Sequence, residues 1–265
     1  MKISIILPTY NRESTIARSI KSILKQTWQD FELIIVDDGS TDNTCSVVES
    51  FSDSRIKYYR QENAGASSAR NIGVTYSETD IIAFCDSDDV WKEEKLEKQV
   101  RFMEVNPSTS LVYTAYMMHT RDRDIRVPKE GNICDKDILS GLLVKNSIGA
   151  PTVMVRKDAF QAVDGFDISM KSLEDWDFAI KVAKEYQIGF IDEILVDAYD
   201  TGTGISHSIA PYFQSRCLMV ARYAKDMQNL GVFDTCVTDI LERANANGIL
   251  DNVKQMLMIY IQDYN

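Results

Sequence analysis

The sequence predicts an α/β fold, with a largely parallel sheet flanked by helices and followed by a helical tail. Short apolar segments typical of buried strands alternate with segments of helical periodicity from residue 3 to about residue 105. Beyond about Pro211 the pattern is wholly helical. Because crossovers between parallel strands are right-handed, the loops that follow the strands should meet at one edge of the sheet.

The composition is that of a globular chain with a substantial core. Of 265 residues, 45% are hydrophobic and 26% are charged. The formal net charge of −11 argues against a nucleic-acid partner, which would need clustered Lys and Arg. The five cysteines form no CxxC pair, so we expect reduced thiols in the cytoplasm. No run of about 18 apolar residues occurs, so we expect no transmembrane segment.

The first strand is expected at residues 3–7 and ends at Pro8. Thr9, Tyr10 and Asn11 form the loop that follows, and Asn11 is a candidate N-cap for the next helix. That helix carries one buried stripe, formed by Ile16, Ile20, Ile23 and Leu24.

The second strand is expected at residues 31–36 and leads into an acidic turn at 37–42. A helix with Val47, Val48 and Phe51 on its apolar face follows the turn. After a third strand at 55–59, the segment 62–73 is rich in small residues, as a helix packed close to a sheet or a ligand requires.

The fourth strand, at residues 81–85, ends in Asp86, Ser87, Asp88 and Asp89. In open α/β sheets, ligands lie outside the carboxyl ends of the strands. Asp86 and Asp88 project to the same side if the backbone stays extended, and such a pair suits a divalent cation that also binds substrate phosphates. The alternative is an acidic turn in which Asp88 or Asp89 caps the following helix.

The second half of the chain mixes helices and strands. We expect a helix at 92–105, a strand at 111–118, a charged loop or hairpin at 121–129 and a strand at 152–155. A turn at 164–167, a helix from 174 to about 186, a hairpin at 188–199 and a glycine-rich loop at 201–207 follow.

The tail, residues 211–265, is expected to form two or three amphipathic helices outside a domain of residues 1–210. Its last helix carries a largely apolar stripe that needs a covering surface. That surface is either the rest of the chain or a second copy, and we expect a homo-oligomer held at least partly by this tail. The stripe consists of Ile249, Val253, Met256, Leu257 and Tyr260.

Five motifs in this order and spacing resemble the family 2 glycosyltransferases of GT-A fold. They cover roughly residues 1–200 and lie at 8–11, 36–42, 63–71, 86–89 and 174–176. The resemblance implies a bacterial, inverting enzyme that moves a sugar from a nucleotide sugar, in the first place a UDP-sugar. The acceptor would be a hydroxyl of a glycan, a glycoprotein or a lipid-linked molecule, and Mn²⁺ or Mg²⁺ would assist. It further implies that residues 1–105 bind the nucleotide and 106–210 the acceptor.

The resemblance also assigns nucleotide-binding roles. Asp38 is implied at the base, or else forms an Asx-turn or a helix cap. Arg70 is implied at the ribose or diphosphate, or else is a solvated charge. Gly65 either lets the backbone approach the nucleotide or begins a helix. The remaining residues implied in nucleotide binding are Pro8, Thr9, Tyr10, Asn11, Asp86 and Ser87.

For the metal and the chemistry, the resemblance implies Asp88 as a direct metal ligand and Asp86 as a ligand of the metal or the ribose. His207 is either a third metal ligand or a surface histidine. Asp175 is implied as the general base. A structural alternative is a capping box with Ser172, although a carboxylate in the first turn of a helix stays ionised in either role.

Two other functions remain open. A nucleotidyltransferase would be expected to carry a glycine-rich basic loop after the first strand, where this chain has residues 8–11. A non-catalytic scaffold subunit that binds nucleotide sugars would not need both Asp88 and Asp175.

Overall fold

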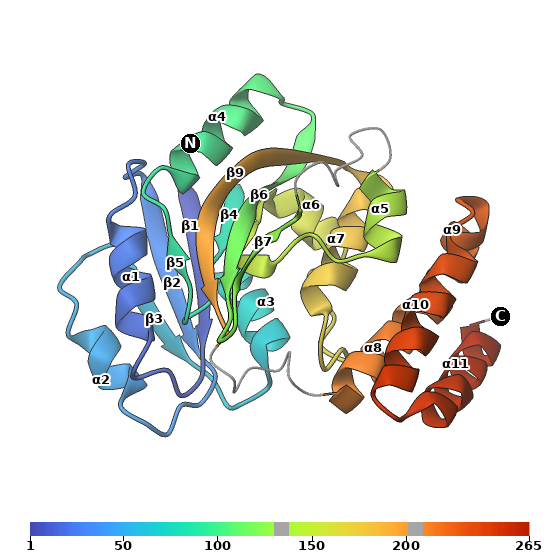
Figure 1. The fold of residues 1–265 in the computed structure, drawn as a ribbon. Helices are drawn as coiled ribbons and strands as arrows, with labels where there is room; N and C mark the ends of the chain where they lie inside the picture. The colour runs from blue at the N-terminus through green and yellow to red at the C-terminus, as the bar shows by residue number, and fades with distance from the viewer. Residues whose placement is uncertain (130–137, 201–208, 265) are drawn as a thin grey trace.

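The computed structural model describes residues 1–129, 138–200 and 209–264. One sheet of nine strands runs through the molecule in the order β3-β2-β1-β4-β8-β6-β9-β5, with β7 paired to β6 (Figure 1). Helices cover both of its faces. The predicted α/β class, the flanking helices and the C-terminal helices are confirmed.

The first half forms the parallel part of the sheet. β1 (Ile3–Thr9) pairs with β2 (Phe31–Asp37) and β4 (Ile81–Phe84), and β2 pairs with β3 (Ile56–Arg60), all in parallel. The intervening helices are α1 (Ile16–Leu24), α2 (Thr44–Glu49) and α3 (Ala66–Tyr76). The carboxyl ends of β1, β2 and β4 therefore lie at one edge, as the crossover rule predicts.

The second half extends the sheet with strands of both directions. β8 (Met154–Arg156) runs antiparallel to β4 and to β6 (Thr109–His119), and β7 (Asp124–Val127) forms a hairpin with β6, one of the two alternatives expected there. The helices of this half are α4 (Lys95–Val105), α5 (Ile138–Val144), α6 (Lys157–Ala162) and α7 (Glu174–Glu185), with a 3₁₀ turn, η1 (Ala150–Thr152), before β8.

Two predicted elements are wrong in type or start. The segment expected as a hairpin at 188–199 is one strand, β9 (Gln187–Tyr199), because it pairs in parallel with β6 along its length across several register shifts. The helix expected from residue 92 begins at Lys95, since β5 (Val90–Trp91) first pairs with the end of β9. Both differences arise from pairing with strands distant in sequence.

Alternate residues of β1 face the two helical layers. Ile3, Ile5 and Leu7 pack in one hydrophobic cluster with α1, α2 and α4, whereas Ile6 packs in the other with α3. A Cβ atom at Gly73 of α3 would lie 2.4 Å from Ile6 Cγ2. The small residues of this segment therefore permit the close packing on the sheet that the sequence predicts.

The tail forms α8 (Ile209–Arg222), α9 (Ala224–Asn229), α10 (Phe233–Ala246) and α11 (Leu250–Tyr264), coloured orange to red in Figure 1. None of the described helices is long and apolar enough to cross a membrane. The apolar stripe of α11 lies against α8 and α10, with Val253 and Leu257 buried. The rest of the chain thus covers the centre of the stripe, and the homo-oligomer stays a prediction.

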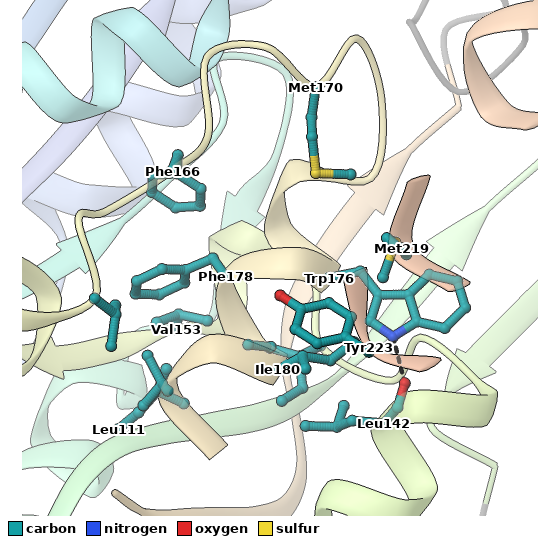
Figure 2. Close-up of a cluster of buried hydrophobic side chains, with 14 of the residues drawn as sticks. Leu111, Leu142, Val153, Phe166, Met170, Trp176, Phe178, Ile180, Met219 and Tyr223 are labelled. Atoms are coloured by element: carbon teal, nitrogen blue, oxygen red, sulfur yellow. Dashed lines mark hydrogen bonds between the residues drawn. The ribbon is translucent and has the colours of Figure 1, made fainter. Parts of the chain in front are cut away.

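The tail belongs to the same core as α7. Met219 of α8 and Tyr223, which lies between α8 and α9, pack around Trp176 and Ile180 of α7 (Figure 2). Phe213, Cys217 and Val220 of α8 are buried in the same cluster. The helices predicted as an appendage therefore complete the core on that side of the sheet.

Candidate active site

A cavity of about 810 Å³ opens at the carboxyl edge of the parallel strands, a volume typical of small-molecule sites. It is lined by the end of β1, the loops after β1, β2 and β4, the starts of α3 and α7, Asn146 after α5, and one residue of α8. Every predicted site residue in the described part of the chain lines it, whereas His207 lies outside the described residues. These are Pro8, Thr9, Tyr10, Asn11, Asp38, Gly65, Arg70, Asp86, Ser87, Asp88 and Asp175.

Hydrogen bonds join the loops after β1 and β2. The backbone N–H of Asp38 donates to Thr9 O at 2.8 Å, and that of Asn11 donates to Ser40 Oγ at 2.9 Å. The side chain of Asn11 accepts from Thr41 N at 2.8 Å. Asn11 is therefore not the N-cap of α1, which begins only at Ile16; its side chain bridges the two loops.

Asp38 anchors the start of α3. Its Oδ1 accepts from Gln61 Nε2 at 2.7 Å and from Ala64 N at 2.8 Å, and its Oδ2 accepts from Gly65 N at 2.8 Å. Asp38 therefore does not form the Asx-turn considered for it, and the neighbouring Asp37 is the residue that bonds within the turn, accepting at Oδ1 from Ser40 N at 2.7 Å. Each carboxylate oxygen has two lone pairs, so Oδ2 of Asp38 can still accept a hydrogen bond from an N–H group of a bound base.

Gly65 and Thr9 both favour a bound ligand beside them. Gly65 precedes α3 with φ 93°, a conformation that favours glycine, and a Cβ atom there would have nothing within 4 Å. The Oγ1 of Thr9 is buried and has no hydrogen-bond partner among the described residues. An unsatisfied buried hydroxyl is costly, so a ligand group that pairs with it would be stabilised.

Arg70 is buried, with only 4% of its surface exposed, so its prediction as a solvated charge is wrong. Its Nη2 lies 2.7 Å from Asp86 Oδ1 and its Nη1 lies 2.8 Å from Glu174 Oε1. Its Nε has no hydrogen-bond partner among the described residues. The guanidinium thereby fixes the end of β4 relative to the start of α7.

Carboxylates crowd the end of β4. Burial and the charge of Asp86 raise the pKa of Asp88, and burial with both of these charges raises the pKa of Asp89. Asp89 Oδ1 accepts from Tyr199 N at 3.3 Å. Neither Asp88 nor Asp89 caps α4, which begins at Lys95 after Glu94, so the cap alternative is wrong.

Asp86 and Asp88 fit a hard divalent cation. No group of three or more His, Cys, Asp and Glu side chains suited to a metal occurs among the described residues. Mg²⁺ and similar ions, however, use one or two carboxylates and complete their coordination with water and substrate phosphates. Two crowded carboxylates in a cavity of nucleotide size have the chemistry of such a site.

Asp175 lies in the first turn of α7 and faces the cavity. Its Oδ1 accepts from Trp176 N at 2.7 Å. The capping box with Ser172 is wrong, because Leu173 is the N-cap residue and no side-chain cap bond forms. Burial, and then the charge of Glu174, raise the pKa of Asp175 to about 7, while Arg70 opposes the shift. A carboxyl with this pKa is suited to accept a proton near neutral pH.

Two of the non-glycine residues with positive φ border this cavity. Asn11 has φ 50° and Leu173 has φ 63°. Such strain costs about 1–3 kcal/mol per residue and often marks functional sites. The strained residue Leu173 directly precedes the first turn of α7, which carries Asp175.

Eight lining residues were not among those assigned a site role from the sequence: Arg12, Asn63, Ala66, Asn146, Ser172, Leu173, Glu174 and Tyr212. Arg12 directly follows the first motif, and its Nη2 lies 3.5 Å from Asp88 Oδ2. Glu174 is the first residue of the fifth motif, so its position in the sequence could have indicated that it lines the site. Asn146 and Tyr212 had no local signal, because the packing of α5 and α8 alone places them here.

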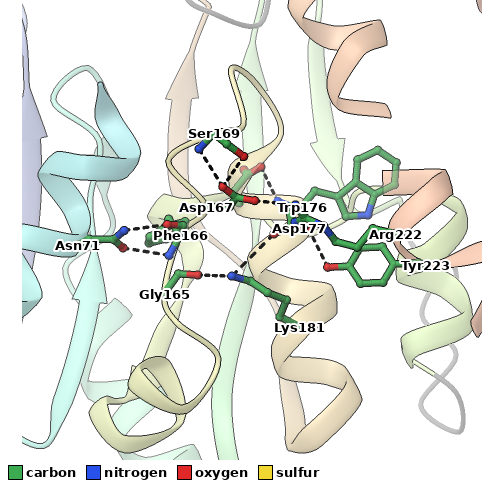
Figure 3. Close-up of polar contacts among 11 residues, drawn as sticks. Asn71, Gly165, Phe166, Asp167, Ser169, Trp176, Asp177, Lys181, Arg222 and Tyr223 are labelled. Carbon is green, nitrogen blue, oxygen red and sulfur yellow. Dashed lines mark hydrogen bonds and ion pairs between the residues drawn. The ribbon is translucent and has the colours of Figure 1, made fainter. Parts of the chain in front are cut away.

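The opposite side of α7 is held by the tail through Asp177, which is 0% exposed. Its Oδ1 accepts from Arg222 Nη1 and from Tyr223 Oη, both at 2.7 Å (Figure 3). Arg222 Nη2 also pairs with Asp167 Oδ2 at 2.7 Å. Asp177 thus faces away from the cavity, as the helical spacing from Asp175 predicts, and the tail supports the helix that carries Asp175.

Comparisons with known proteins agree with the motifs. Residues 4–163 match the family model Glycosyl transferase family 2. The Escherichia coli protein named UDP-Glc:alpha-D-GlcNAc-diphosphoundecaprenol beta-1,3-glucosyltransferase WfgD is 37% identical over 193 residues, 72% of this chain and 73% of that protein. An uncharacterized glycosyltransferase of Rickettsia conorii is 35% identical over 195 residues, 73% of this chain but only 32% of that protein. The chain thus spans about a third of the length of some curated relatives.

Solved structures share the fold. The structure of Staphylococcus aureus TarS 1–349 in complex with UDP-GlcNAc superposes with a TM-score of 0.80 at 22% identity, covering 100% of this chain and 80% of that one. The mannosyltransferase PcManGT from Pyrobaculum calidifontis, in complex with GDP-Man and Mn²⁺, has a TM-score of 0.65 at 16% identity, covering 99% and 84%. At these identities the likeness establishes the fold alone.

Proposed function

This chain belongs to glycosyl transferase family 2, and from that premise we propose that it transfers a sugar from a UDP-sugar to an acceptor hydroxyl with inversion. The observation that carries the proposal is the meeting of Asp175 with the nucleotide-motif residues in one cavity. The names of the E. coli relative and of the TarS complex support a UDP-sugar donor. The family match gives no support to a nucleotidyltransferase, and Asp175 in the cavity disfavours a scaffold without turnover.

In the proposed reaction, the acceptor oxygen forms a bond to the anomeric carbon as the bond from that carbon to the diphosphate breaks. Asp175 accepts the acceptor proton, and UDP leaves with the bonding electrons. Thr9 and Asp38 bind the base, and Asp86 with Ser87 binds the ribose. Mn²⁺ or Mg²⁺ held by Asp88 with Asp86 would offset the charge on the leaving diphosphate. Positioning of donor and acceptor supplies most of the remaining benefit.

Among glycan, glycoprotein and lipid-linked acceptors, we propose a lipid-linked sugar. The E. coli relative is named for a sugar attached to diphosphoundecaprenol, which supports this class. We also propose a cytoplasmic location, because the four described cysteines, Cys45, Cys85, Cys217 and Cys236, are all free thiols.

Replacing Asp88 with alanine is expected to abolish metal-dependent transfer. Loss of charge compensation at a leaving diphosphate costs several kcal/mol, so we expect turnover below about 1% of wild type at saturating Mn²⁺. UDP release from a UDP-sugar, with and without Mn²⁺, measures this. Asp251→Ala is the matched control, because Asp251 is exposed on α11. Retention of more than a few per cent of activity by Asp88→Ala would contradict the assignment.

The acidic limb of the pH profile is expected to follow Asp175. Only the ionised carboxylate accepts a proton, so kcat/KM should fall as the pH drops below about 7, the pKa of Asp175. The charge of Glu174 contributes to that raised pKa. Glu174→Gln should therefore move the limb to lower pH, as pH profiles of kcat/KM for both proteins would show. A limb that stays in place, or moves to higher pH, would exclude Asp175 as its source.

A further inference from the structure

A second cavity, of about 300 Å³, lies beside the candidate active site. Its walls come from β6, from β7 and the two residues after it, and from α5 with the loop that follows. Asn146 lines both cavities. The described lining of the second cavity is Tyr113, Tyr116, Ile125, Arg126, Val127, Pro128, Lys129, Ile138, Gly141, Leu142, Lys145, Asn146 and Ser147.

The wall formed by α5 is bonded to the helix that carries Asp175. Trp176, the next residue, donates from Nε1 to Leu142 O at 2.5 Å (Figure 2), and Leu142 lines the second cavity. On the β6 wall, burial and then the charge of Asp175 raise the pKa of Tyr116. Asp175 is therefore close to both cavities, and a molecule that occupies both would pass it.

The second cavity has an apolar interior with basic residues and no acidic residue among the described lining. This is notable in a chain with a net charge of −11. Arg126 pairs with Asp192, so its charge is compensated. The ammonium groups of Lys129 and Lys145 are exposed and make no ion pair with a described residue. The cavity thus offers two lysine side chains that have no ion-pair partner in the described part of the chain, beside an apolar surface.

We propose that this second cavity binds the diphosphate and the first prenyl carbons of a polyprenyl-diphosphate-linked sugar acceptor. The inference rests on the proposed function, since it takes Asp175 as the base that receives the acceptor proton. The acceptor sugar lies in the first cavity beside Asp175, and the diphosphate lies past Asn146 at Lys145 and Lys129. The first carbons of the prenyl chain then lie against Ile125 and Leu142.

The size of the cavity supports this division of the acceptor. About 300 Å³ is the lower limit for small-molecule sites, so it holds only a short part of a long prenyl chain. Two ammonium groups match the charge of a diphosphate, and the apolar walls match the carbons attached to it. The remainder of the prenyl chain would stay in the bilayer.

Farnesyl diphosphate tests the proposal without the need to know the acceptor sugar. Its binding is measured by calorimetry in saturating UDP, which occupies the nucleotide site of the first cavity. We expect farnesyl diphosphate to bind at least about tenfold more tightly than inorganic diphosphate or farnesol, because each of these lacks one half of the interaction.

Variants test separately which residues bind the diphosphate and which bind the prenyl carbons. Lys145→Ala should weaken farnesyl diphosphate binding about tenfold, as expected for one lost charge-assisted hydrogen bond. Ile125→Asn should weaken the binding of farnesyl diphosphate while that of inorganic diphosphate stays the same. Lys254→Ala is the matched control, since Lys254 is exposed on α11 and lines neither cavity.

The outcomes distinguish this proposal from the proposed function. If UDP fails to bind the wild-type protein, the proposed function fails first. If UDP binds but farnesyl diphosphate binds no better than inorganic diphosphate, the second cavity takes an anion only and the lipid proposal is overturned. Equal behaviour of Lys145→Ala and Lys254→Ala would overturn it as well.

Discussion

Replacing Asp175 with asparagine is expected to slow sugar transfer by about 10²–10⁴-fold, because asparagine cannot accept the acceptor proton. UDP binding should stay nearly unchanged, since the nucleotide contacts are assigned to other residues. Single-turnover transfer and calorimetric titration with UDP measure the two effects. A variant that transfers at the normal rate would exclude Asp175 as the base.

The stability of the same variant separates catalysis from capping. Burial raises the pKa of Asp175 to about 7, so the folded state favours the protonated carboxyl. The stability that this protonated form contributes is lost as the pH rises through that value. Asp175→Asn should therefore melt at the same temperature as wild type or higher at pH 8. A helix cap would instead lose stability on the same substitution.

Asp158→Asn is a closely matched control. Asp158 lies in the first turn of α6, and its Oδ1 accepts from Ala159 N at 2.7 Å, the same contact that Asp175 makes with Trp176. It lines neither cavity. We expect a stability change of no more than about 1 kcal/mol and a normal transfer rate.

Deleting residues 211–265 is expected to unfold the protein. The deletion would uncover Trp176 and Ile180, which pack against α8, and each buried side chain of this size contributes about 1.5–3 kcal/mol. It would also remove Arg222 and Tyr223 from Asp177 and leave it only the longer pair with Lys181, at 3.8 Å; breaking a buried ion pair costs about 3–5 kcal/mol. Together these losses rival the whole stability of a typical domain, about 5–15 kcal/mol.

Circular dichroism and thermal unfolding of the shortened chain measure this result. A folded protein that still transfers sugar after the deletion would show that the tail is a separable appendage. A milder variant gives a graded answer: Arg222→Ala should lower the free energy of unfolding by about 3 kcal/mol. Arg243→Ala, which breaks a surface pair with Asp239, should cost no more than about 1 kcal/mol.

The convergence of the site could be predicted from the sequence. Thr9 ends β1, and Asp38 and Asp86 follow β2 and β4; parallel strands joined by right-handed crossovers bring such residues to one edge. Asp175 came from a motif rather than from the sheet rule. The motif was sufficient because the start of a helix is a local feature of the sequence.

The partners of those residues could not be predicted in the same way. The sequence leaves two roles for Arg70, a ligand contact or a solvated charge. The structure buries its side chain between Asp86 and Glu174. Asp38 was considered as an Asx-turn or a helix cap, and it holds the start of α3 instead. Each partner lies far along the chain, so no local pattern records it.

The sequence by itself determined the class of sheet and the edge at which the cavity opens, because periodicity and turn chemistry are local. The motif residues that line the cavity were implied by the resemblance of the sequence to a family. Only the tertiary structure decided that β9 is one strand, that α11 is covered by its own chain and that α8 contributes Tyr212 to the cavity. An amphipathic helix shows that one of its faces must be buried. It does not show which surface covers that face, because the choice depends on packing between residues distant in sequence.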